Sequence, residues 1–450
     1  MVAGGSRAGS TARLRTPSCF MAAQPPQGPT GRGFVPPART ARPSHSRPRA
    51  RSAKPAPPGP GDSIPMRDTF LVFGQPLIEQ AEMDEVLDSM KRAWIGTGPK
   101  VHQFEKDFAA YKGMPYAAAV NSCTAALQLS CLALDLARGD EVITTAMTFC
   151  ASVNAIIHSG ATPVLADVDP VTQNIDPADI ERRITPRTKA LLVVHFAGRA
   201  CDMDPIMDIA RRHNLAVIED CAHAIETTYK GRQAGDIGDI GCFSFYATKN
   251  VVTGEGGMIL SRDKARIDRM KIMGLHGMSA DAWARFSDSG YKHYYVVDHG
   301  FKYNMMDMQA ALGIHQLKRV EAYWKRREAV WQRYMQAFAD LPLGLPAAPE
   351  PDTRHAYHLF AIRVNEACCG VSRDAMLPMM TARKIGVGVH YLAIPEHPYY
   401  QKNYGWNPDD YPNAVAYGRE TISLPLSPKL SEQDVDDVIE AVRGIITGNG

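Results

Sequence analysis

Three side chains with chemical potential lie at the ends of two apolar segments of the sequence. Asp220 closes the segment LAVIED (215–220), Ser244 lies within CFSFYA (242–247), and Lys249 lies two positions after the second segment. Each segment has the continuous apolar character of a buried strand. Ligands of open α/β sheets lie at the carboxyl ends of strands, where all three residues would fall. We therefore expect the three residues to share one ligand site.

These side chains suit a charged aromatic ligand with a phosphate tail. A carboxylate such as Asp220 can pair with a ring cation, Ser244 can reach a phosphate, and the amine of Lys249 can form a Schiff base. Pyridoxal phosphate (PLP) needs these three functions. The alternatives are a helix cap for Asp220 and a solvated loop lysine for Lys249. Taken together, those alternatives would leave a charge at a buried strand end without a partner, which is costly.

Other residues could complete such a site. Ser122 and Thr124 lie where a strand (116–122) passes into a helix, and the first turn of a helix attracts phosphate through its free N–H groups and dipole. Ser122 could equally be a simple helix cap. Phe149, after the strand 141–145, could lie face-on against a pyridine ring or belong to the core. His223 could contact the phenolic oxygen of the cofactor or be a structural histidine.

The elements that must position these residues follow an alternating pattern from residue 66 onward. Two amphipathic helices (79–94 and 101–113) precede strands separated by helices, and a long helix starts near 306. This pattern predicts an α/β fold whose mostly parallel central sheet is covered on both faces. After it we expect a smaller C-terminal α/β domain with strands at 355–364 and 386–391 and a final helix capped by Ser431. The predicted domains are 66–312, which would bind the cofactor, and 313–450.

The amino-acid composition argues against several classes of function. The chain has 450 residues, is 45% hydrophobic and carries a net charge of +2, but residues 1–65 hold nine Arg and one Lys against one acid. The remainder is mildly acidic, so nothing suggests nucleic-acid binding, and no apolar run reaches membrane-spanning length. The nine cysteines have no zinc-type spacing, and we expect no metal but reduced thiols in a cytoplasmic protein. Residues 1–65, rich in Pro, are predicted to be a disordered extension rather than a targeting peptide.

From about Phe70 to Ile446 the sequence resembles the DegT-like sugar aminotransferases, which are fold-type I PLP enzymes. The resemblance rests on ordered motifs that include GTGPKVHQFEKDFAAYKG, NSCTAALQL, AMTFCASVNAI, VIEDCAHAIE, CFSFYATKNVVTGEGGMI, FKYNMMDMQAALGIHQL, HAYHLF and GVGVHY. It implies that Lys249 is the Schiff-base and proton-transfer lysine. It further implies that Asp220 binds the pyridinium, that His223 lies near the phenolic oxygen and that Phe149 stacks on the ring. The phosphate would be held by Ser122, Cys123 (through its amide), Thr124 and Ser244.

Asn304 matches a family residue that reaches the phosphate of the neighbouring subunit, so the resemblance implies a homodimer with shared active sites. Two positions depart from the family pattern. Cys123 stands where the family usually has Gly, which keeps the amide donor but adds a side chain near the phosphate. Met306 replaces the usual Thr before Asp307 and removes a hydroxyl.

Lys249 distinguishes two branches of the family, because related PLP- or PMP-dependent sugar dehydratases have His in its place. The resemblance therefore implies transfer of an amino group, from L-glutamate as the expected donor, to a nucleotide-linked keto-sugar. The segments FKYN, TKN and HAYHLF look most similar to enzymes that aminate UDP-linked 4-keto sugars. The alternatives are a sugar dehydratase and a non-catalytic regulator with the same fold. Sugar specificity is expected from segment 276–299 and from the region around His390 and Tyr391.

Overall fold

The computed structural model describes residues 67–279 and 293–448, all of which belong to one compact unit of the chain. The predicted N-terminal extension lies outside the described residues. Most of segment 276–299, which was expected to contribute to sugar specificity, also lies outside them.

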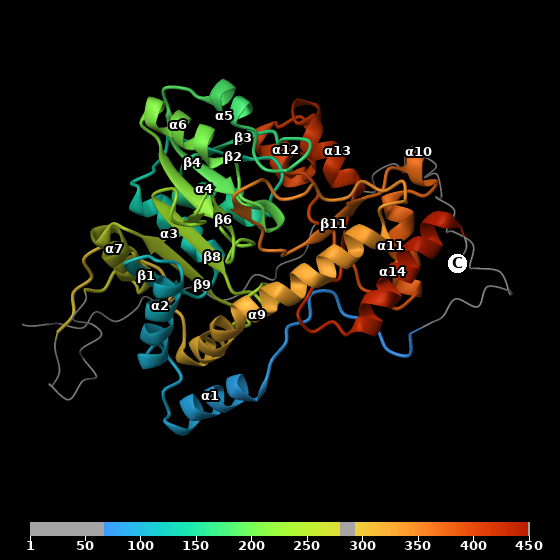
Figure 1. The fold of residues 1–450 in the computed structure, drawn as a ribbon. Helices are drawn as coiled ribbons and strands as arrows, with labels where there is room; N and C mark the ends of the chain where they lie inside the picture. The colour runs from blue at the N-terminus through green and yellow to red at the C-terminus, as the bar shows by residue number, and fades with distance from the viewer. Residues whose placement is uncertain (1–66, 280–292, 449–450) are drawn as a thin grey trace, which may run out of the picture. The chain divides into compact units, whose positions relative to one another are not determined.

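A seven-stranded sheet forms the centre of the described fold (Figure 1). Six strands run in one direction, and β9 alone is antiparallel to both of its neighbours. The predicted α/β fold with a mostly parallel sheet is therefore confirmed. In spatial order the strands are β1 (Tyr116–Val120), β9 (Gly257–Ser261), β8 (Ile240–Ser244), β5 (Ala216–Asp220), β4 (Thr188–Val194), β2 (Glu141–Thr145) and β3 (Thr162–Ala166).

Helices cover both faces of the sheet, as the apolar strands require. Successive residues of a strand point to opposite faces, so Leu192 joins one core while Leu191 and Val193 join another. The first core includes residues of α3 (Cys123–Ala133), α4 (Cys150–Ser159) and α7 (Lys264–Gly274). The opposite face is covered by α2 (Pro99–Tyr111), α5 (Pro177–Arg183), α6 (Met203–His213) and the start of α9 (Asp307–Ala337).

Helix α9 runs from the sheet domain into the C-terminal part of the fold (Figure 1). At its start, Asp307 accepts hydrogen bonds from the amides of Lys100 and Val101 and so caps α2. Phe104 of α2 is fully buried and lies against Gly313, where any Cβ would come within 2.6 Å of the ring. Helix α1 (Gln80–Lys91) also packs on α9. Among the described helices, none is both long and apolar enough to cross a membrane.

The C-terminal part has its own core. Strands β11 (Phe360–Arg363) and β12 (Thr421–Leu424) form an antiparallel pair. Their apolar side chains pack with the second half of α9, with α10 (Glu366–Cys369), with α11 (Arg373–Ala382) and with α14 (Glu432–Thr447). Ser431 caps α14 as predicted, since its hydroxyl accepts the amide of Asp434 while the Asp434 carboxylate accepts the amide of Ser431.

Two strands predicted in this region are wrong in type or extent. Residues 386–391 form no strand, because the amides of Gly386 and Gly388 bond to separate segments, at Leu71 and Ser423. In 355–364 only the last residues form β11, since the preceding amides bond instead to the loop at 197–198. The remaining described elements are β6 (Thr228–Tyr229), β7 (Arg232–Gln233), β10 (Thr353–Arg354), α12 (Pro398–Tyr404), α13 (Pro412–Glu420) and the 3-10 turns 196–198, 394–396 and 408–410.

Candidate active site

A cavity of about 490 Å³ lies at the carboxyl ends of β5 and β8. It brings together every predicted site residue except Asn304. Its wall is formed by the start of α3, the start of α4, the end of β4 at Val194, the ends of β5 and β8 with the loops that follow them, and segment 390–391. The predicted residues that line it are Ser122, Cys123, Thr124, Phe149, Asp220, His223, Ser244 and Lys249.

Asp220 is the last residue of β5 and is buried. Its carboxylate accepts a hydrogen bond of 2.8 Å from the hydroxyl of Ser152 and one of 3.1 Å from the amide of Ala222. Both donors are uncharged. Burial raises the pKa of Asp220 above its ordinary value, although the two hydrogen bonds and the charge of Lys249 oppose that shift. A cationic group at this carboxylate would therefore be stabilised strongly.

Lys249 lies in the turn that follows β8, where its amide bonds to the carbonyl of Tyr246. Burial of the amine lowers its pKa to about 8, even though Cys123 and Asp220 favour the charged form. Roughly a tenth of such an amine is neutral at pH 7, far more than for an ordinary lysine. The neutral amine is the nucleophile that Schiff-base chemistry requires.

The start of α3 forms the end of the cavity that suits a phosphate. The Ser122 hydroxyl accepts the amide of Ala125, so the helix-cap role considered for it is present in the structure. Ser122 nonetheless lines the cavity together with Cys123, Thr124 and Ser244. Behind them β9 approaches closely, and a Cβ at Gly257 would lie 2.6 Å from the backbone of Ser122. Free amides, hydroxyls and a glycine that permits close approach make a cradle for an anion.

Phe149 and His223 both lie close to the ring of Tyr391. Phe149 precedes α4 and is 56% exposed, so it is not a core residue. Its ring centroid lies 5.8 Å from that of Tyr391. His223 is buried and uses both ring nitrogens: Nδ1 accepts the amide of Ala197 at 3.2 Å, and Nε2 lies 3.1 Å from the hydroxyl of Tyr391. Burial and the charge of Lys249 hold the pKa of His223 well below its ordinary value, so the ring is neutral.

Asn304 does not line the cavity. It forms a bridge to Val120, and its side-chain amide donates to the hydroxyl of Thr97 at 2.6 Å. Its side chain instead lines a small separate cavity of about 60 Å³ beside β1 and α2. Within its own subunit Asn304 is therefore not brought to the residues that would hold the cofactor.

Several residues of the cavity were not predicted with a role. Ser152 carried a detectable signal, because it is a hydroxyl in the first turn of a mainly apolar helix that begins beside Phe149. The sequence predicted only that the region around His390 and Tyr391 contributes to sugar specificity. Because a strand was expected there, the directions of the two side chains could not be predicted. Thr148, Tyr246, Thr248, Glu255 and Gly256 also line the cavity, and no local pattern in the sequence distinguishes them.

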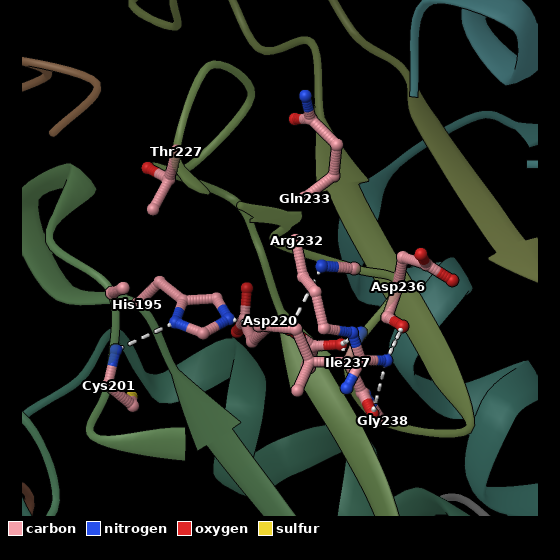
Figure 2. A network of polar contacts seen from close by, with 12 residues as sticks. His195, Cys201, Asp220, Thr227, Arg232, Gln233, Asp236, Ile237 and Gly238 are labelled. Carbon is pink, nitrogen blue, oxygen red and sulfur yellow. Dashed lines mark hydrogen bonds and ion pairs between the residues drawn. The ribbon is translucent and has the colours of Figure 1, made fainter. Parts of the chain in front are cut away.

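On the opposite face of β5, a buried ion pair supports this end of the sheet. Nε2 of His195 lies 2.9 Å from Glu219, whose carboxylate also accepts the amides of Gly235, Ile237 and Gly238. Figure 2 shows His195 beside the end of β5, with its contact to the amide of Cys201 marked. Among the described residues, His195, Glu219 and Cys221 are grouped closely enough to hold a metal. Because the carboxylate already has four partners, a structural ion pair explains the group.

With this geometry in hand, comparison with known proteins identifies the family. Residues 76–443 match the DegT/DnrJ/EryC1/StrS aminotransferase family. The chain belongs to this family, and it is an aminotransferase by class.

Individual relatives match this chain over nearly their whole length. The spore coat polysaccharide biosynthesis protein SpsC of Bacillus subtilis is 50% identical over 386 residues, which are 86% of this chain and 99% of SpsC. The PMP-form structure of Spr1654 from Streptococcus pneumoniae, assigned as a sugar aminotransferase, has a TM-score of 0.79 at 34% identity and covers 84% of this chain and 99% of its own. The PLP form of Spr1654 has a TM-score of 0.77 at 33% identity, with the same coverage.

These findings confirm the predicted family, fold class and enzyme class, and with them the predicted cofactor, pyridoxal phosphate. The residues of the cavity fit that group. A buried carboxylate with uncharged donors suits the pyridinium, a lysine with a lowered pKa suits the aldehyde, and the start of α3 suits the phosphate.

Proposed function

We propose that this protein transfers an amino group from L-glutamate to a nucleotide-linked keto-sugar, and that the acceptor is a UDP-linked 4-keto sugar. The observation that carries the proposal is the placement of Lys249 and Asp220 in one cavity with a helix N-terminus. The relatives support a sugar acceptor, since SpsC takes part in spore coat polysaccharide biosynthesis and Spr1654 is assigned to sugars. The choice of UDP and of the 4-keto position rests on the resemblance of segments FKYN, TKN and HAYHLF.

In this proposal each residue has a distinct task. PLP supplies an electron sink that stabilises negative charge at the carbon losing a proton. Asp220, oriented by Ser152, keeps the ring nitrogen protonated. Lys249 would hold the aldehyde carbon of the cofactor, and its amine, once free, would carry the proton between two carbons. The amides of Cys123 and Thr124, with Ser122 and Ser244, hold the phosphate, and Phe149 covers one face of the ring.

Lys249 favours amination over the dehydratase alternative. A dehydratase of this family would have His at this position, whereas the lysine supplies both the Schiff base and the proton carrier that transamination needs. A non-catalytic regulator would have no use for Lys249 and Asp220 together in one cavity. The amination proposal accounts for both residues.

We also propose that the active enzyme is a homodimer in which Asn304 of each subunit reaches the phosphate site of the other. In its own subunit, Asn304 lies outside the cavity. Helix α1 and the residues after it also expose an unusual group of apolar side chains, which a second copy of the chain would cover: Met83, Leu87, Met90, Trp94 and Ile95.

The test combines a spectrum with a substrate panel. The purified, PLP-loaded protein should show a visible absorbance band that glutamate bleaches while 2-oxoglutarate is released. UDP- and dTDP-linked 3-keto and 4-keto sugars are then incubated with the glutamate-treated protein, and the products are identified by mass spectrometry. A product in which an amino group replaces the ketone, together with return of the visible band, supports the proposal. Loss of a sugar oxygen without matching 2-oxoglutarate would instead identify a dehydratase.

A further inference from the structure

We propose that the hydroxyl of Tyr391 is the hydrogen-bond donor that the cavity offers to the phenolic oxygen of PLP, and that His223 is a positioning residue that acts through Tyr391. The inference rests on the proposed function, because it concerns the same cofactor site. It also changes an expectation, since the family resemblance gives the contact with the phenolic oxygen to His223 itself.

The first step of the argument is the protonation pattern of His223. The amide of Ala197 can only donate, so Nδ1, at 3.2 Å, must be an acceptor. The ring is neutral and has one proton, which therefore lies on Nε2. Nε2 is 3.1 Å from the hydroxyl oxygen of Tyr391 and donates to it. Both nitrogens of His223 are thus engaged within the protein.

The second step concerns the proton of Tyr391. Because its oxygen accepts from His223, the O–H of Tyr391 remains available for another acceptor. Burial, together with the negative charge of Asp220, raises the pKa of Tyr391, so the hydroxyl stays a donor at neutral pH. Tyr391 lines the cavity, and its ring lies next to Phe149. A phenolic oxygen carrying negative charge is the kind of acceptor that such a donor stabilises.

The third step is the rigidity of this arrangement. The ring of His358 lies 4.3 Å from that of His223, centroid to centroid, and Nδ1 of His358 lies 2.9 Å from the side-chain oxygen of Asn250. The Asn250 amide donates to Glu226, which is paired with Arg327 of α9. All of these side chains are buried. The ring of His223 therefore packs on His358, and a chain of polar contacts that begins on α9 fixes the orientation of His358.

A direct contact from His223 to the phenolic oxygen would require Nε2 to break its hydrogen bond with the hydroxyl of Tyr391. The two arrangements differ in a measurable way, because a donor on the ionised phenolic oxygen lowers the pH at which the cofactor chromophore titrates. The groups that face this region are Asp220 and Cys150 toward Tyr391, and Lys249, His358 and His390 toward His223. None of them is changed in the test variants.

The experiment measures the pH midpoint of the visible band in PLP-loaded wild type and in four variants. Tyr391→Phe should raise the midpoint by about one pH unit or more, the effect of losing one charge-assisted hydrogen bond. His223→Leu should raise it by less, since the hydroxyl remains but loses its alignment. His223→Gln retains an N–H donor and should stay close to wild type. Tyr400→Phe is the matched control, because Tyr400 is buried and bonds to Asn154 away from the cavity lining.

An unchanged midpoint in Tyr391→Phe, with a raised one in His223→Leu, overturns the proposal. Should Tyr391→Phe fail to fold or load, a crystal structure of the PLP-loaded wild type decides. The Tyr391 hydroxyl within about 3 Å of the phenolic oxygen supports the inference, and Nε2 of His223 in that place refutes it. A wild-type protein without any visible band would contradict the proposed function, whereas a band that titrates independently of Tyr391 contradicts this inference alone.

Discussion

The hydroxyl of Ser152 lies 2.8 Å from Oδ2 of Asp220 and joins the first turn of α4 to the end of β5. The same hydroxyl lies 2.8 Å from that of Thr148. Helix α4 therefore contributes twice to the site, through the exposed ring of Phe149 at its start and through the side chain that orients the buried carboxylate.

Replacement of Ser152 by Ala should lower kcat about tenfold, which corresponds to the loss of one hydrogen bond to a charged group. The reason is that burial already raises the pKa of Asp220, and the loss of a donor raises it further. Steady-state kinetics measure the effect. Ser159→Ala is the control, because Ser159 ends the same helix, donates to the carbonyl of Ile156 and does not line the cavity. Equal activities for the two variants would argue against an orienting role for Ser152.

Replacement of Lys249 by Ala should remove the visible band of the PLP-loaded protein and reduce turnover by at least about 10²-fold, the usual contribution of a positioned acid–base group. Lys249→Arg should behave in the same way, because a guanidinium forms no Schiff base at neutral pH. Lys264→Ala is the control, since Lys264 is on the surface and pairs with Asp268. If the Lys249→Ala variant still consumed glutamate catalytically, Lys249 would not be the Schiff-base and proton-transfer residue.

The lowered pKa of Lys249 predicts a specific pH dependence for cofactor capture. The neutral amine is the reactive form, so the rate at which apoprotein acquires the visible band should rise about tenfold per pH unit below pH 8 and level off above it. A lysine with its ordinary pKa of 10.5 would give a rate that continues to rise. Stopped-flow absorbance at limiting PLP distinguishes the two curves.

Replacement of Glu219 by Gln should destabilise the fold by about 2–5 kcal/mol, because the change leaves buried donors and His195 poorly paired. Burial alone would raise the pKa of Glu219, but the contact with His195 and the backbone amides lower it. The stabilisation of the fold by ionised Glu219 is present above pH 4.5 and is lost as the pH falls through the lowered pKa of Glu219. His195, with its pKa raised, contributes below pH 6.5 and loses that contribution as the pH rises through its own pKa. Urea unfolding across this range measures the effect, with the surface variant Glu181→Gln as control.

Shared active sites predict complementation between subunits. Lys249→Ala and Asn304→Ala should each be inactive or weak alone, but a mixture that exchanges subunits should recover up to about a quarter of wild-type activity. The recovery arises because each mixed dimer has one site with both residues intact. Size-exclusion chromatography with light scattering verifies the dimer. A mixture no more active than its components would place Asn304 outside the partner's site.

Local patterns in the sequence were sufficient to predict the strands of the sheet and the residues at their carboxyl ends. Asp220 and Lys249 follow apolar runs, and parallel β5 and β8 are direct neighbours, which brings the two residues to the same cavity. The partner of Asp220 could not be predicted, because Ser152 precedes it by 68 positions in the chain. The side-chain position of Tyr391 could not be predicted, because its segment looks like a strand but bonds to two separate parts of the fold.

The roles given to the site residues, the homodimer and the boundary between 312 and 313 stay predictions. That boundary falls within α9, which is continuous from Asp307 to Ala337.

Helix α9 also restricts how the two parts of the fold can move. Gly313 is not a hinge, because its missing side chain makes room for the ring of Phe104 and the helix continues through it. Bending there would break helical hydrogen bonds and open the contact with α2. Helix α9 is therefore rigid, and a displacement at one of its ends moves the other end as well. Any closing motion between the two parts of the fold must therefore occur outside α9, and the sheet and the start of α9 would keep their spacing throughout a turnover.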